Sequence, residues 1–239
     1  MRPEGMGPDE WRSVERAIES FLPYYERVNL ANTFGRLPLW RQQVASTAKP
    51  DDVVLDLGSG PGGFARLLST RRVLCIDPSR AMIGHARRAL AGDGYRFLSG
   101  LVERLPLRPG SVDKVYCSFS FRDFLDKGAA IREIARVLRP GGELHVLEAS
   151  RPPPGWRRAF MDSWLRFGVP AVVTALVPRR TRSRWREPPF AAFVRTYEAL
   201  GRPESYLPSL RESGFEDAGV EYLSMRSVFH LWGVRARTT

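Results

Sequence analysis

The chain has 239 residues, 43% of them hydrophobic, which is enough for one domain with a large core. It contains no run of 18 apolar residues and no apolar N-terminal segment, so neither a transmembrane helix nor a secretory signal is expected. The formal charge of +11 suggests nucleic acid, but only three of the 37 basic residues are lysines. Genome composition or a hot habitat would produce the same preference for arginine over lysine, so the charge alone does not indicate a nucleic-acid partner.

Apolar periodicity predicts alternating strands and helices through the first 150 residues. Trp11, Val14 and Ile18 recur at helical spacing over residues 9–22, and an aromatic segment at 24–41 is expected to lie over a ligand. Strands are predicted at 53–57, 72–76, 95–99, 112–118 and 143–149, with helices at 63–70, 79–90 and 127–138. Ser79 and Asp126 are the expected N-caps of the last two helices.

The alternation breaks at residues 151–155, an Arg-Pro-Pro-Pro-Gly segment. An aromatic stripe with interleaved arginines follows, formed by Trp156, Phe160, Trp164 and Phe167. Between residues 151 and 187, nine arginines stand against two acidic residues. Helices are predicted at 189–200 and 206–213, and strands at 217–223 and 228–235 would close the chain as a reversed hairpin.

These elements predict an α/β fold with a doubly wound, mostly parallel seven-stranded sheet and a helical lid insertion. We expect one domain over residues 1–239. Its parts would be an N-terminal helical segment (1–50), a ligand-binding core (51–150), a basic aromatic lid (151–205) and a C-terminal helix with the hairpin (206–239).

Cysteine and histidine positions indicate structural roles. Cys75 and Cys117 fall in predicted strands and are expected to be reduced core residues, as is usual in the cytoplasm. His145 and His230 also fall in strands and are expected to be satisfied there. Histidines and cysteines do not cluster at metal-ligand spacing, so no metal site is predicted.

The most informative segment runs from Val53 to Gly63, where an apolar strand enters a glycine-dense turn. A strand, a glycine turn and a helix N-terminus together form a cradle for nucleotides, because glycine lets a ligand approach the backbone closely. A second strand ends at Asp77, 21 residues after Asp56. A carboxylate there can accept hydrogen bonds from ribose hydroxyls, so an adenosine-containing ligand is predicted.

Two adenosine cofactors fit this loop. Gly58, Gly60 and Gly63 satisfy G-x-G-x-x-G, which a nicotinamide site would use. Asp56, two residues before the first glycine, favours a cationic ligand instead. About fifty residues precede the strand, whereas dinucleotide-binding folds often start at it. Downstream, residues 111–118 carry a D-x-V pattern and residues 138–142 an L-x-P-G-G turn. With the glycine loop, these segments resemble the class I S-adenosylmethionine (SAM) methyltransferases, which favours SAM over NAD.

That resemblance implies a site in which the glycine loop passes under the methionine part of SAM and Asp77 holds the ribose. Ser118 and Phe119 would lie between cofactor and acceptor. The implied cofactor contacts are Asp56, Gly58, Ser59, Gly60, Pro61, Asp77, Pro78, Leu101, Val102, Ser118 and Phe119.

Three further segments narrow the resemblance. Residues 24–35 with Trp40-Arg41, residues 119–123 and residues 147–152 resemble motifs of the ubiquinone/menaquinone-biosynthesis C-methyltransferase family. Glu26 and Thr33 are mild departures from the first motif. Leu101 stands where that family usually has an Asp that reaches the adenine amino group. Losing such a hydrogen bond costs on the order of 1 kcal/mol, or about fivefold in affinity.

The family resemblance implies C-methylation of a small aromatic or quinone-like lipid precursor, although residues 153–213 match the family poorly. Arg122 is expected either to steady an acceptor phenolate or to form an ion pair with Asp123 or Glu148. Asp123 and Tyr25 are candidates for a base or proton relay.

The aromatic stripe allows two interpretations. Its aromatic face could pack on the sheet while the arginines face water. Alternatively, the aromatics and arginines could contact an anionic membrane or a prenyl tail, which would make the protein cytoplasmic with peripheral contact at the inner membrane face.

Two other functions remain open. The arginine-rich face could serve an RNA or protein methyltransferase, but residues 117–120 read Cys-Ser-Phe-Ser and lack the N/D-P-P-Y/F turn of enzymes that methylate base amino groups. A non-catalytic SAM-binding partner subunit would be consistent with Leu101. The sequence does not predict an oligomeric state.

Overall fold

The computed structural model describes residues 22–92, 94–183 and 189–237, together with Asp9, Arg12, Arg16 and residues 19–20. The apolar positions that predict a helix over 9–22 (Trp11, Val14 and Ile18) lie outside the described residues, as do residues 184–188 of the arginine-rich segment. Within the described part, no helix is both long and apolar enough to cross a membrane.

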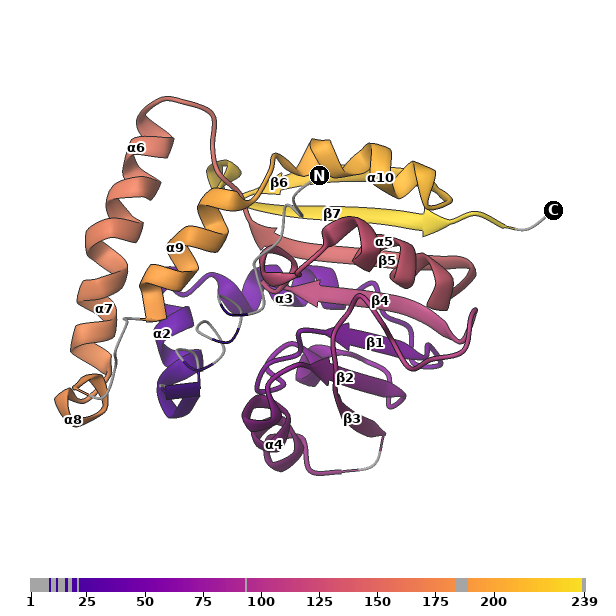
Figure 1. Cartoon of the computed structure of the whole chain (residues 1–239), viewed down its shortest axis with the longest axis horizontal. Helices are drawn as coiled ribbons and strands as arrows, with labels where there is room; N and C mark the ends of the chain where they lie inside the picture. The colour runs from indigo at the N-terminus through magenta and orange to yellow at the C-terminus, as the bar shows by residue number, and fades with distance from the viewer. Residues whose placement is uncertain are drawn as a thin grey trace.

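A seven-stranded sheet in the order β3-β2-β1-β4-β5-β7-β6 forms the centre of the molecule (Figure 1). Its parallel strands are β1 (Val54–Leu57), β2 (Val73–Asp77), β3 (Tyr95–Ser99), β4 (Val112–Ser118) and β5 (Leu138–Ala149). β7 (Val228–Arg235) runs antiparallel to both β5 and β6 (Phe215–Leu223). The predicted fold class is therefore confirmed, including the reversed hairpin at one edge.

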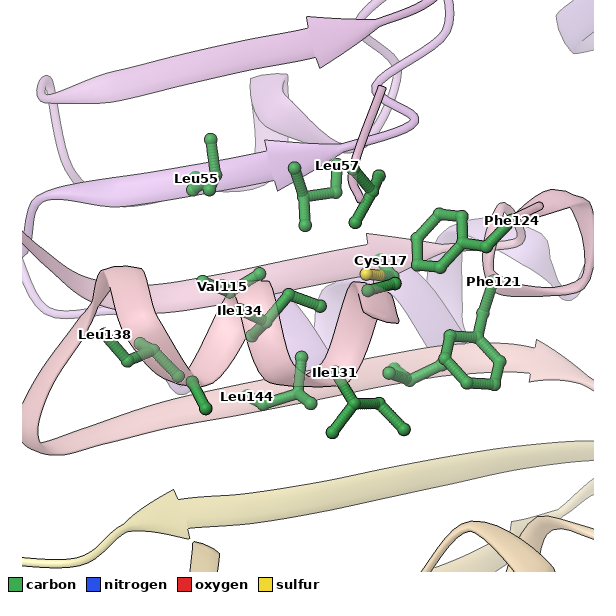
Figure 2. Packing of buried hydrophobic residues seen from close by; sticks show 14 of the residues in the cluster. Leu55, Leu57, Val115, Cys117, Phe121, Phe124, Ile131, Ile134, Leu138 and Leu144 are labelled. Carbon is green, nitrogen blue, oxygen red and sulfur yellow. The ribbon is translucent and has the colours of Figure 1, made fainter. Parts of the chain in front are cut away.

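Helices cover both faces of this sheet. α3 (Leu37–Ala45) packs on one face, and α5 (Lys127–Val137) and α10 (Leu207–Glu212) pack on the other. α4 (Arg80–Ala89) packs against β2 and β3. Figure 2 shows Ile131 and Ile134 of α5 over Val115 and Cys117 of β4. Burying two apolar layers of this kind supplies most of the stabilisation of a domain, which fixes the strand ends that carry the site.

The predicted caps are confirmed. Ser79 accepts a hydrogen bond from the backbone N–H of Met82 at 3.1 Å, and Asp126 accepts one from that of Ala129 at 2.9 Å. These bonds satisfy N–H groups that the first turn of a helix leaves unpaired. Both cysteines are buried and free, as expected.

The two strand histidines are buried and satisfied, which confirms their structural assignment. Nδ1 of His145 lies 3.1 Å from Nε2 of His230, and its other ring nitrogen lies 2.9 Å from the Glu143 carboxylate. The pair lies on the α3 face, where the Thr47 hydroxyl also approaches His145 at 3.4 Å.

The helix predicted at 63–70 is wrong: only a short 3-10 turn, η2 (Ala65–Leu67), forms there. Leu68 returns to extended backbone, with φ −72° and ψ 137°. The hydroxyls of Ser69 and Thr70 then donate to the carbonyls of Ala48 and Asp52 at 2.7 and 2.6 Å. These side-chain bonds to the loop before β1 compete with a continuing helix.

β5 begins earlier than its predicted start at residue 143. Leu138 already pairs with Val112, and the register shifts before Lys114 pairs with Glu143. The Pro-Gly-Gly turn at 140–142 is therefore a bulge within the strand, with Gly141 at φ +76°.

The lid between β5 and β6 stands beyond the carboxyl ends of the parallel strands (Figure 1). α6 (Trp156–Ser163), a π-turn (Trp164–Gly168) and α7 (Val169–Leu176) are consecutive in the chain, and we call residues 156–176 the lid helix. The short α8 (Arg179–Arg182) and α9 (Pro189–Ala199) follow. Together with α2 (Tyr25–Asn32), the lid has its own apolar cluster, which includes Val28, Leu165, Val169, Val173 and Tyr197.

Packing of the whole aromatic stripe on the sheet is contradicted. Trp156, Phe160 and Phe167 are 67%, 49% and 66% exposed. Trp164 turns inward, where its indole N–H donates to the Asn32 carbonyl at 3.2 Å. The exposed ring of Phe34 lies 4.4 Å from the ring of Trp164 and 6.4 Å from that of Phe160. The lid helix therefore presents three aromatic side chains to the outside.

Candidate active site

The glycine turn after β1 forms the floor of a cavity. Gly58 and Gly60 have φ of +63° and +53°, which side-chain-bearing residues rarely adopt. A Cβ on Gly58 would collide with Ser120, whereas one on Gly60 would meet nothing within 4 Å. Gly58 is therefore required by packing, while Gly60 leaves open space in which a ligand can approach the backbone.

Asp77, at the end of β2, ties this turn in place. Its two carboxylate oxygens accept hydrogen bonds from the backbone N–H groups of Gly60 and Ser79, both at 2.9 Å. The carboxylate also lines the cavity. Since a carboxylate has about four acceptor positions, Asp77 can bind a ligand hydroxyl while it holds the loop.

Asp56 is completely buried, and its carboxylate oxygens have no hydrogen-bond partner among the described residues. Burial raises the pKa of Asp56 to about 7, and the nearby Asp77 charge adds to this effect. The charge of Arg41 acts in the opposite direction, as does the nearby backbone N–H of Ala65, which lies outside hydrogen-bond geometry. A buried carboxylate without partners is costly, so a donor or cation in the cavity would stabilise it.

The first cavity opens at the carboxyl ends of β1, β2 and β4, and it spans about 920 Å³ when the solvent at its mouth is included. It brings together every residue proposed from the sequence for cofactor binding, and also Tyr25, Arg122 and Asp123. Leu101 lies on its wall with its side chain 42% exposed.

A second cavity lies between the sheet and the lid, and it spans about 1300 Å³ when the solvent at its mouth is included. Its wall is mostly apolar, and most of it comes from α2, α3 and the lid helix, with α9 and β7. The two cavities share five lining residues: Tyr25, Arg41, Phe119, Arg122 and Asp123. They therefore meet at a polar junction beyond the end of β4.

Arg122 is the centre of that junction. Its guanidinium forms ion pairs with Glu148 at 2.7 Å and with Asp123 at 3.6 Å, and it donates to the Phe119 carbonyl at 2.9 Å. Arg122 therefore pairs with both Asp123 and Glu148, the two ion-pair partners considered from the sequence. The Nε–H of Arg122 is buried and has no partner in the described structure, which leaves a donor for a ligand.

Burial shifts the pKa values of two other side chains at the junction, Asp123 and Tyr25. Desolvation raises the pKa of Asp123, and Glu148 adds to the rise, while Arg122, Thr196 and Lys127 oppose it. Desolvation also raises the pKa of Tyr25 above its ordinary value of 10.0. Tyr25 is therefore a neutral phenol near pH 7, which suits it to donate a hydrogen bond rather than to act as a base.

Similarity to known proteins agrees with this geometry. The Methyltransferase domain family matches residues 55–146. A ubiquinone/menaquinone biosynthesis C-methyltransferase UbiE from Rubrivivax gelatinosus is 35% identical over 155 residues, 62% of this chain and 60% of that protein. A second UbiE, from Legionella pneumophila strain Corby, is 30% identical over 67% of this chain and 70% of its own length. The chain belongs to the class I SAM-dependent methyltransferases, in the UbiE family.

One further relative carries the name of a related enzyme, and two solved structures share the fold. A demethylmenaquinone methyltransferase from Thermus thermophilus is 37% identical over 56% of this chain and 64% of that protein. A SAM-dependent methyltransferase from Thermotoga maritima has a TM-score of 0.64 at 19% identity, covering 95% of this chain and 99% of its own. A Haemonchus contortus phosphoethanolamine N-methyltransferase, bound to S-adenosylhomocysteine, has a TM-score of 0.58 at 14% identity, with 82% and 52% coverage.

The first cavity of this methyltransferase fits SAM. Gly60 leaves room beside the backbone, Asp77 offers carboxylate oxygens, and Asp56 offers a buried carboxyl group that a cationic ligand would hold in its charged form. These features suit an adenosine with a cationic methionine part.

Two charged residues of the site, Arg41 and Glu103, were not predicted from the sequence. Arg41 is 8% exposed, lines both cavities and bonds Glu26 at 3.1 Å and the Ser118 hydroxyl at 3.3 Å. The Trp40-Arg41 pair, which resembles a motif of the family, could have indicated it from the sequence. Glu103 lines the first cavity and accepts from the Leu125 backbone N–H at 2.8 Å. It lies in a loop without a recognisable pattern.

Proposed function

We propose that the protein methylates a carbon atom of a small apolar aromatic acceptor, of the quinone-precursor class. The observation that carries this proposal is the meeting of two cavities, one suited to SAM and one largely apolar, at Tyr25, Arg41, Phe119, Arg122 and Asp123. The names of the UbiE relatives support the acceptor class.

On the cofactor side, Asp77 would accept from the ribose hydroxyls and Gly60 would lie against the ligand. Asp56 would face the positive charge. When bound, SAM supplies an electrophilic methyl group on a sulfonium. The polypeptide's main task is then to hold the acceptor carbon in line with that methyl group and to exclude water.

On the acceptor side, the Nε–H of Arg122 would donate to an acceptor oxygen and stabilise its negative charge. Asp123 would take the hydroxyl proton, because its raised pKa makes it a better proton acceptor than an exposed carboxylate. Tyr25 would orient the ring by donating a hydrogen bond. Loss of the hydroxyl proton makes the ring carbon more nucleophilic.

A labelled-methyl assay tests the proposal. Purified protein and methyl-labelled SAM are incubated with lipid extract and with total RNA in parallel. Label in a small lipid-soluble aromatic product supports the proposal, whereas label in RNA or in protein contradicts it. Calorimetry that finds SAM binding without transfer to any fraction would instead identify a non-catalytic partner subunit.

We also propose that the outer face of the lid helix contacts an anionic membrane, from which the acceptor would enter. Trp156, Phe160 and Phe167 are exposed, and Arg157 and Arg166 lie over two of these rings at 5.3 and 5.5 Å. Exposed aromatics flanked by arginines suit an interface with lipid phosphates.

Vesicle co-sedimentation tests this contact. We expect binding to vesicles that contain phosphatidylglycerol and loss of that binding when Trp156, Phe160 and Phe167 are all changed to Ser. Met225→Ser, which removes an exposed apolar residue outside the lid helix, is the matched control. Equal partitioning of all three proteins would contradict the contact.

A further inference from the structure

α9 touches the junction through one aromatic side chain. The ring of Phe193 lies 4.6 Å from the guanidinium carbon of Arg122 and also lines the second cavity. A ring over the face of a guanidinium attracts its charge and fixes the plane of the group. Phe193 thus restricts Arg122 from the side that its two carboxylate partners leave open.

A second side chain of α9 reaches the neighbouring carboxylate. Thr196, one turn after Phe193 and only 4% exposed, shares its hydroxyl between the Phe193 carbonyl, to which it donates at 3.2 Å, and the Asp123 carboxylate beside it. Tyr197 anchors the helix, since its hydroxyl donates to the Ser150 carbonyl at 3.2 Å, just beyond β5. α9 therefore contacts the 3-10 turn that carries Arg122 and Asp123 and is anchored by Tyr197 just beyond β5.

We propose that α9 is the positioning element of the reaction, with Phe193 holding Arg122 and Thr196 holding Asp123 in their working orientations. The inference rests on the proposed function and extends it to two residues of α9 that act through Arg122 and Asp123. It follows that the lid both encloses the acceptor and sets the geometry of the polar pair.

Two substitutions test the two contacts separately. Phe193→Leu keeps an apolar wall but removes the aromatic face, so kcat should fall about tenfold with KM for the acceptor little changed. Affinity for S-adenosylhomocysteine, measured by calorimetry, should stay within about twofold of the parent value. Glu198→Ala, on the exposed side of α9, is the matched control and should match the parent protein.

The pH profile tests Thr196. The groups that face Asp123 are Arg122 from its own turn, Glu148 from β5, Lys127 from α5 and Thr196 from α9. The Thr196 hydrogen bond lowers the pKa of Asp123, so Thr196→Val should move the acidic limb of kcat to higher pH. Thr196→Ser, which keeps the hydroxyl, should restore the parent profile.

The outcomes separate this inference from the function on which it rests. If Phe193→Leu and Thr196→Val match Glu198→Ala in kcat and pH profile while Arg122→Lys is impaired, α9 has no positioning role. If Arg122→Lys is as active as the parent protein, the proposed role of Arg122 fails as well. Circular dichroism and thermal melting of each variant exclude unfolding as the cause of a lost rate.

Discussion

The cofactor side and the acceptor side of the site are built in different ways. Gly60 and Asp77, on the cofactor side, follow two neighbouring strands and bond each other. The acceptor side gathers Asn29 from α2, Leu165 from the lid helix and Phe193 from α9, which are far apart in the chain. Local backbone rules position the first group, whereas only tertiary packing positions the second.

This difference predicts that the two sides can be disabled separately. A substitution on the cofactor side should weaken the binding of S-adenosylhomocysteine. A substitution at the acceptor junction should lower kcat while that binding remains. The following measurements test this separation.

The largest effect is expected from Arg122→Lys. Lysine keeps the charge but loses the planar fork that pairs with Glu148 and leaves Nε–H for the acceptor. We expect kcat to fall about 100- to 1000-fold, the usual loss when one donor to developing charge is removed. Arg132→Lys on the exposed side of α5 is the control. A parallel, equally large loss of S-adenosylhomocysteine affinity would break the separation.

Acid should weaken the sheet that both sides share. Burial and the neighbouring His145 lower the pKa of His230 from 6.5 to about 4. The unfolded chain therefore binds more protons between these values, and stability that is complete above pH 6.5 is lost as pH falls toward 4. The loss is on the order of 3 kcal/mol.

Urea unfolding at several pH values measures this loss. The difference in unfolding free energy between the parent protein and His230→Leu should shrink or reverse as pH falls from 6.5 to 4. His85→Leu, outside the histidine pair, is the control variant. A difference for His230→Leu that stays constant over this pH range would refute the assignment.

Asp77→Asn should weaken S-adenosylhomocysteine binding about 10- to 50-fold, because it loses charge-assisted hydrogen bonds to the ribose. Asn can still accept a hydrogen bond from Gly60 or Ser79, so the loop should stay folded. Calorimetry gives the dissociation constant, and the exposed Asp217→Asn is the control. Unchanged affinity would show that Asp77 does not bind the cofactor.

The smallest effect is expected from Leu101→Asp, which restores the acceptor that the family usually has at this position. We expect about fivefold tighter binding of S-adenosylhomocysteine, corresponding to one regained hydrogen bond. Leu101→Asn separates the hydrogen bond from the added charge. Weaker binding of the Asp variant would place the adenine away from Leu101.

The sequence predicted the sheet and the residues of the first cavity because each depends on a short pattern. An apolar strand, a glycine turn and a following acidic residue lie within a few positions of one another. The missing helix at 63–70 shows the limit, since Ser69 and Thr70 bond residues about 20 positions earlier.

The second cavity could not be predicted in the same way. Nothing local in the stripe shows that Trp164 turns inward toward Asn32 while Trp156 and Phe167 stay exposed. The side that each aromatic faces depends on α2, which is more than a hundred residues away in the sequence. Arg41 was missed for the same reason, because its contact with Ser118 joins α3 to the end of β4.

The most direct test is a crystal structure with S-adenosylhomocysteine. We expect its ribose on Asp77, its adenine toward Leu101 and its sulfur at the junction between Phe119 and Arg122, facing the apolar cavity. A ligand that points its sulfur away from this junction, or a first cavity that takes up a pyrophosphate dinucleotide instead, would contradict the proposed site.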